Sequence, residues 1–153
     1  MDFEIETLVD YARDAIESFA AEHPDETFYA FAIDADMLCL NSVEQFEKTL
    51  KVYQAKYPKQ YHTQKDIEEL WWNTGDWEYQ GFADFGNCEG FVHYHYSDHY
   101  ELGMNLDADD PALNDTPYAK AMDVVIEQLI NSNAFAGLKL SPKFKAIRAE
   151  HNY

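Results

Sequence analysis

Positive charge is scarce in this sequence. Its 153 residues include 11 Lys and Arg against 29 Asp and Glu, which gives a formal net charge of −18 and a pI near 4.4. Nucleic-acid binding needs a positive field that displaces the counterions of the phosphates, and anionic membrane surfaces repel an acidic protein. We therefore expect neither nucleic acid nor a membrane as a partner. A basic protein partner, a cation and simple solubility all remain compatible with this charge.

Long hydrophobic runs and closely spaced cysteines are also missing. No apolar stretch approaches the ~18–20 residues of a membrane helix, and the acidic start MDFEIETLVD lacks the basic region of a signal peptide. Cys39 and Cys88 lie 49 positions apart and match no CxxC spacing, so we expect two reduced, structural thiols. These observations predict a cytoplasmic protein that forms a single globular domain over residues 1–153.

The motifs of common catalytic chemistry are absent as well. No serine lies in a GxSxG or SxxK motif, and the chain has no GxGxxG and no Walker loop. The acidic loop that begins at Asp107 does not match a calcium-binding EF-hand, because Ala112 and Tyr118 stand where glycine and glutamate are required. The sequence therefore predicts a protein that is not an enzyme and carries no cofactor.

Hydrophobic and aromatic residues, by contrast, are plentiful. They make up 46% and 16% of the chain, which is enough for a packed core. Periodicity, together with the capping residues Ser42, Thr63 and Thr116, predicts helices over residues 5–20, 42–57, 63–72 and 117–130. The same reasoning predicts strands over 27–34 and 37–40, short strands and turns over 77–105, and a short strand or helix in the basic tail 138–153. The fold class that follows is α+β, an antiparallel or mixed sheet packed against about four helices.

A histidine-rich segment, HYHYSDH, is the candidate for a metal site. On a strand, His93 and His95 would point to the same face, and Asp98 and His99 just beyond could complete the ligand set. The pattern departs from the HxHxDH of metallo-hydrolases by one inserted residue, and the only histidine further along is His151. The alternative is a polar strand face on which histidines alternate with buried tyrosines. A small metal-binding protein or metal-dependent hydrolase is thus the second hypothesis.

Aromatic residues cluster in the middle of the chain. Trp71 and Trp72 are neighbours on a predicted helix and point about 100° apart, so both cannot face the core, and we expect Trp72 at the surface. Tryptophan and tyrosine in an acidic surround suit a protein-binding surface, although packing in the core would also explain them. The predicted partner-binding residues are Trp72, Trp77 and Tyr79, with an acidic rim of Asp107, Asp109 and Asp110.

Four segments carry a family resemblance. TFYAFAID, LCLNSVEQFEKTLKVY, IEELWWNTGDWEYQGF and FKAIRAEHNY resemble a bacterial family of unknown function, whose members are small acidic proteins found beside polymorphic and contact-dependent toxin genes. The resemblance spans nearly the whole chain but includes no catalytic signature, and the histidine segment is not part of it. It implies an immunity protein that binds a cognate toxin and blocks it.

The resemblance and the charge lead to one expectation. Many antibacterial toxins are basic nucleases, and an acidic partner would associate with them quickly through electrostatic steering. We therefore expect a non-catalytic immunity protein that covers the active-site cleft of a basic toxin. The identity of the toxin and the oligomeric state stay open.

Overall fold

A four-stranded mixed sheet forms the centre of the protein. The structure, a computed structural model, describes residues 2–150. The strands β1 (Thr27–Asp34), β2 (Met37–Ser42), β3 (Tyr79–Asp84) and β4 (Lys139–Ala149) lie in the order β3-β2-β1-β4. Strand β1 pairs antiparallel with β2 and parallel with β4, while β2 pairs antiparallel with β3. The α+β prediction is therefore confirmed, with a mixed sheet.

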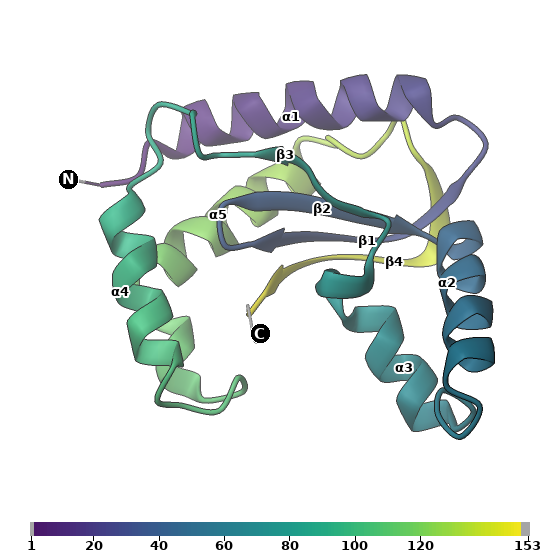
Figure 1. The fold of residues 1–153 in the computed structure, drawn as a ribbon. Helices are drawn as coiled ribbons and strands as arrows, with labels where there is room; N and C mark the ends of the chain where they lie inside the picture. The colour runs from purple at the N-terminus through teal and green to yellow at the C-terminus, as the bar shows by residue number, and fades with distance from the viewer. Residues whose placement is uncertain (1, 151–153) are drawn as a thin grey trace.

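Five α-helices surround this sheet (Figure 1). Their bounds are α1 (Ile5–Glu22), α2 (Val43–Lys56), α3 (Gln64–Trp72), α4 (His93–Gly103) and α5 (Pro117–Asn131), with 3-10 turns η1 (Thr74–Asp76) and η2 (Pro111–Asn114). The predicted caps are present: the side chains of Ser42, Thr63 and Thr116 each accept a hydrogen bond from the backbone N–H three residues on. Of the helices within residues 2–150, none is long and apolar enough to cross a membrane.

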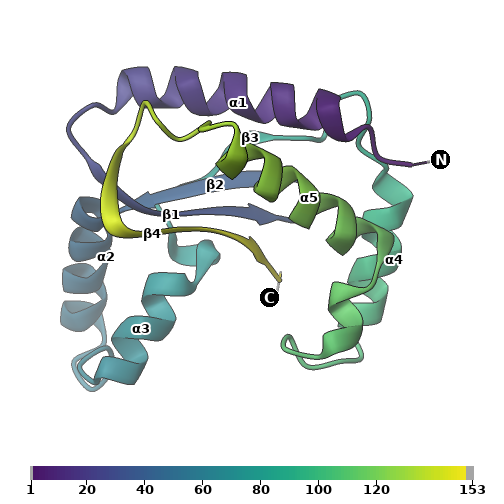
Figure 2. The same cartoon turned by 180° about the vertical axis from the view of Figure 1, so that it is seen from behind.

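Two apolar clusters hold the helices to opposite faces of the sheet. Helices α1 and α5 cover one face, as the view from behind shows (Figure 2). The cluster on this face includes the buried residues Leu8, Phe31 and Met122. Helices α2 and α3 pack on the other face around Tyr29 and Phe46. The strand β1 lies between these layers and is buried on both faces, as its continuous apolar sequence predicts.

The histidine segment is a helix, so the prediction of strands beyond residue 88 is wrong. Residues 93–103 form α4, and its N-cap residue Val92 lies at steps of four and three from Tyr96 and His99 on the inner side. The alternation of histidine and tyrosine suggested a strand because aromatic residues favour strands. Tertiary packing overrides this preference, since α4 lies against α5 and η2 rather than beside another strand.

The basic tail forms the edge strand β4, the longest strand of the sheet. Its register against β1 jumps between Leu140, which faces Phe28, and Lys145, which faces Ala30. The extra residues include Pro142, which has no N–H to donate to a ladder. Regular pairing with β1 resumes at Lys145 and continues to Ala149.

Candidate functional site

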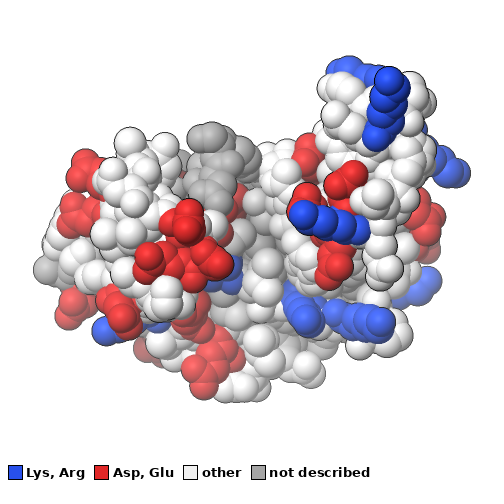
Figure 3. Space-filling model, turned by 90° about the horizontal axis from the view of Figure 1, so that it is seen from below, with Lys and Arg blue, Asp and Glu red and all other residues white. Residues whose placement is uncertain are grey.

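Two helical arms project from the same side of the sheet at its opposite ends (Figure 1). We call residues 93–115, which comprise α4, the following loop and η2, the acidic arm. Residues 43–72, which comprise α2 and α3, are the α2–α3 arm. The acidic arm contains six Asp and Glu residues and no Lys or Arg, whereas the α2–α3 arm contains five of each sign. Seen from below, red acidic side chains gather on one side of the molecule, and most of the blue Lys and Arg side chains lie on the other side (Figure 3).

Trp72 and the acidic loop line the same hollow between the arms. The hollow has a volume of about 970 Å³ and is bounded by several residues of α3, including Trp72, and by Ala108 of the acidic arm. Asp107 and Asp109 flank Ala108 in the chain and are both exposed. The tertiary structure thus brings the predicted aromatic residue of α3 close to the predicted acidic rim.

The three predicted acidic residues are not equivalent. Asp107 and Asp109 are exposed, so they can face a partner. Asp110 is half-buried, and its carboxylate accepts a hydrogen bond of 2.9 Å from the backbone N–H of Ala112, which caps η2. Asp110 therefore also fixes the local shape of the acidic arm.

The other two predicted aromatic residues lie elsewhere. Trp77 is only 4% exposed, and its indole N–H donates to the backbone carbonyl of Trp71 at 3.0 Å, so it offers almost no surface to a partner. Tyr79 packs against Phe19 of α1, among the apolar residues on the face opposite Trp72. Its hydroxyl donates to Glu26 at 2.6 Å. Of the three, the structure places only Trp72 beside the acidic arm.

The histidines of the metal hypothesis do not converge. On helix α4, His93 and His95 project about 200° apart rather than to one face. His93 lies 3.2 Å from the carbonyl oxygen of Gly86, Asp98 is exposed, and His99 points into the protein. Within the described residues 2–150, no group of three or more His, Cys, Asp or Glu could hold a metal ion. His151 lies outside that range.

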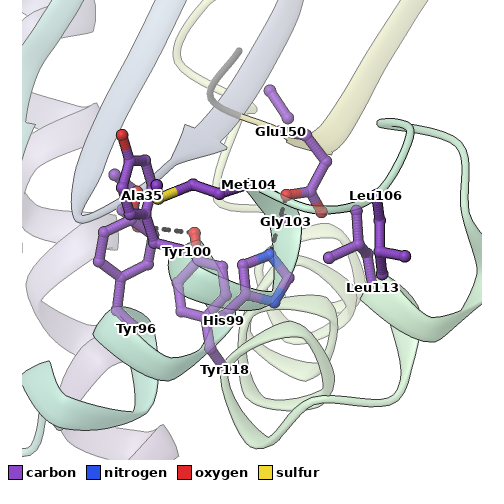
Figure 4. A pocket seen from close by; sticks show the side chains of 11 residues that line it. Ala35, Tyr96, His99, Tyr100, Gly103, Met104, Leu106, Leu113, Tyr118 and Glu150 are labelled. Carbon is purple, nitrogen blue, oxygen red and sulfur yellow. Dashed lines mark hydrogen bonds and ion pairs between the residues drawn. The ribbon is translucent and has the colours of Figure 1, made fainter. Parts of the chain in front are cut away.

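His99 instead anchors the acidic arm to the rest of the domain. Its side chain is 3% exposed, with Nδ1 2.6 Å from the Thr116 hydroxyl and Nε2 2.8 Å from a carboxylate oxygen of Glu150. An ionised carboxylate only accepts hydrogen bonds, so Nε2 donates to Glu150. Figure 4 shows this contact at the edge of a cavity of about 380 Å³, also lined by Tyr96, Tyr100 and Met104.

Glu150 joins this histidine to a buried arginine. The second carboxylate oxygen of Glu150 accepts from Arg148, which also donates to Asp123 of α5 at 3.0 Å and to Asn114 of η2 at 2.7 Å. Burial alone would raise the pKa of Glu150, but the hydrogen bonds and positive charges of His99 and Arg148 outweigh it and hold that pKa below its ordinary value. Sequence reasoning missed Glu150 and Arg148 because their other partners, His99, Asp123 and Asn114, are distant in the chain.

The thiols offer no nucleophile. Cys39 is buried in β2, and burial raises the pKa of its thiol to about 12. Cys88 also has a raised pKa, because of partial burial and the nearby carboxylates of Glu89 and Glu4. Both cysteines are free, and a raised pKa keeps a thiol in its unreactive protonated form.

One family matches most of the chain. Residues 8–138 match the family described as a domain of unknown function, DUF4303. The chain belongs to the DUF4303 family. No curated protein and no solved structure gave a match.

The DUF4303 match divides the candidate site. Trp72, His99 and the whole acidic arm lie within the matched residues. Strand β4 and Glu150 follow them, so the sheet edge and the carboxylate partner of His99 lie beyond the matched part of this DUF4303 protein.

Proposed function

We propose that this protein is a non-catalytic immunity protein that binds a basic bacterial toxin and covers its active site. The observation that carries the proposal is the charge of residues 66–119, which contain thirteen Asp and Glu and no Lys or Arg. Six of these acids lie on the acidic arm, which stands away from the sheet where a partner can reach it. The assignment to a toxin rests on the family resemblance.

The proposed mechanism combines steering with occlusion. A surface of one sign attracts a partner of the opposite sign at long range and raises the association rate. Asp107 and Asp109 would meet basic residues around the toxin cleft, while Trp72 across the hollow would supply an apolar contact of the kind that dominates binding energy. No step of this mechanism requires a reaction by the immunity protein.

The alternative, a metal-dependent hydrolase, has weaker support. It needs His93, His95, Asp98 and His99 around one ion, but α4 distributes these side chains around a helix. His99 also has both ring nitrogens within hydrogen-bond distance of protein groups. The histidine segment therefore favours an anchoring role over a catalytic one.

The first test is capture of a partner followed by a growth assay. Tagged protein is incubated with lysate of its host and of neighbouring strains at low and moderate salt, and bound proteins are identified by mass spectrometry. We expect one basic protein at stoichiometric amounts, which inhibits growth when expressed alone and loses that effect when this protein is co-expressed. A captured protein that is harmless, or whose toxicity persists, would contradict the proposal.

A variant then tests the acidic arm. Replacing Asp107, Asp109 and Asp110 by Asn should lower the association rate for the captured toxin about tenfold at low salt and leave the dissociation rate nearly unchanged. The matched control replaces Asp10, Asp14 and Glu17 of α1 by Asn, Asn and Gln, which removes the same charge from another surface. If both variants lowered the association rate equally, the rate would depend on net charge alone and not on the acidic arm.

A further inference from the structure

The outer edge of β4 is an unpaired sheet edge. Strand β4 pairs with β1 on one side, and within residues 2–150 no strand pairs with its other side. Figure 2, the view from behind, shows β4 as the nearest strand of the sheet. The five residues from Lys145 to Ala149 pair regularly with β1, so this stretch presents a regular strand edge that another strand could join.

Apolar hollows flank this edge on both faces of the sheet. On the face of α5, a hollow of about 440 Å³ is lined by Ile130, Phe135, Leu140 and Phe144, and Ile130 and Leu140 are 52% and 40% exposed. On the face of α3, a hollow of about 510 Å³ is lined by side chains that include Ile67, Trp71, Trp72, Lys143 and Lys145. An added strand sends alternate side chains to opposite faces, so each hollow would receive every second side chain.

The charge of β4 is opposite to that of the protein as a whole. The strand contains Lys139, Lys143, Lys145 and Arg148 and no acidic residue, in a chain of net charge −18. Arg148 is bonded to Glu150 and Asp123, whereas Lys143 and Lys145 are exposed and line the hollow on the side of α3. Lys145 also extends over the ring of Trp72, at 5.8 Å from its centroid. An incoming strand would therefore meet a mainly apolar surface on one face. On the other face it would meet an aromatic surface with two lysines and one acidic residue, Glu68.

We infer that the outer edge of β4 binds an extended segment of a partner protein in which apolar side chains alternate with acidic ones. The apolar side chains enter the hollow beside α5, and the acidic ones pair with Lys143 and Lys145. The same lysines disfavour a second copy of this chain at the edge, because like charges on adjacent strands repel. This inference does not rest on the proposed toxin binding, which uses the acidic arm, although Trp72 lines the hollows of both surfaces.

A synthetic peptide tests the inference directly. The probe is an acetylated and amidated heptapeptide of alternating Val and Glu, and the comparison peptide carries Lys in place of Glu. Hydrogen exchange followed by mass spectrometry reports where the full-length protein is protected, and a titration gives the two dissociation constants. We expect the Val/Glu peptide to protect amides of residues 143–149 and to bind about tenfold more tightly than the Val/Lys peptide, because opposite charges pair across strands.

Charge reversal provides the matching protein variants. The variant Lys143→Glu/Lys145→Glu should bind the Val/Lys peptide more tightly than the Val/Glu peptide. The control Lys48→Glu/Lys51→Glu on α2 makes the same change in net charge and should still bind the Val/Glu peptide more tightly. Circular dichroism melts check that both variants fold. Three results would overturn the inference: no binding of the Val/Glu peptide, protection elsewhere than β4, or an equal effect of the two variants. Dimerisation with protection of residues 143–149 in the absence of peptide would assign the edge to a second copy and would also overturn it.

Discussion

The two arms of this protein are attached to the sheet in different ways. The α2–α3 arm is electrically balanced and is held by aromatic packing, with the ring of Trp71 stacked on Tyr29 at 3.6 Å between centroids and edge-on to Phe46. The acidic arm has no cation of its own, and the single buried residue of α4 is His99. Its connection to the sheet is a polar network that reaches Glu150 and Arg148 at the end of β4.

This difference shows how a domain can present a strongly charged segment. Burial of apolar side chains stabilises an arm whatever its charge, but the buried part of the arm can no longer make polar contacts with a partner. A segment rich in acidic residues can instead be held by a few buried hydrogen bonds, whose strength depends on protonation. The acidic arm should therefore respond to pH and to polar substitutions, and the α2–α3 arm to loss of apolar volume.

The largest expected effect is on the α2–α3 arm. Trp71→Ala removes the stack on Tyr29 and should lower the free energy of unfolding by about 3–4 kcal/mol, measured by urea denaturation. The control Val52→Ala, on the exposed side of α2, should change it by less than about 0.5 kcal/mol. A loss below about 1 kcal/mol for Trp71→Ala would show that stacking does not hold this arm.

A smaller effect is expected at the polar anchor of the acidic arm. His99→Ala removes hydrogen bonds to Thr116 and Glu150 and should lower the free energy of unfolding by about 2–3 kcal/mol. Amide exchange should accelerate in α4 more than in α2, because the arm detaches locally before the sheet unfolds. The conservative variant His99→Gln can keep one of the hydrogen bonds and should recover part of the stability. Uniform acceleration in both arms would contradict a local anchor.

The smallest expected effect concerns pH. The pKa of Glu150 is lower in the folded protein than its ordinary value of 4.5, so its ionised form stabilises the fold above that value. This stabilisation is lost as the pH falls through the folded pKa. Glu150→Gln should therefore lower the free energy of unfolding by about 1–2 kcal/mol at pH 7, and its difference from the native protein should shrink as the pH falls below 4.5 and through the folded pKa. Denaturation curves from pH 7 to pH 3 measure this difference in the free energy of unfolding. A difference that does not change with pH would show that the charge of Glu150 does not stabilise the fold.

Local sequence signals predicted much of the fold. Ser42, Thr63 and Thr116 mark helix starts because a side-chain oxygen must satisfy free backbone N–H groups there. The apolar run of residues 27–34 predicted a strand covered on both faces, which β1 is. The helix α4 was missed because its alternating aromatic residues favour a strand locally, whereas the helix packs Tyr96 and His99 against Tyr118 of the distant helix α5.

The candidate site was predictable only in part. The proximity of Trp72 to the acidic loop could not be read from the sequence, since about 35 residues separate them and the two arms meet only through the sheet. Trp77 precedes β3 and is buried in the cluster around Tyr29, whereas Tyr79, the first residue of β3, packs in the cluster on the opposite face. The face that Tyr79 occupies depends on the register of β3. A shift of one residue in a strand reverses that side.

The sequence by itself determined the charge, the helix caps, the central strand and the fold class, because each depends on composition or on neighbours within a few positions. Only the tertiary structure decided that His99 meets Glu150, that β4 lies at the sheet edge, and that Trp72 and Ala108 of the acidic arm line one hollow. These relations join residues 35 to 51 positions apart, or strands whose order local preference does not encode. They form when burial of the two apolar clusters fixes the sheet, since that burial is the main force that brings distant segments together.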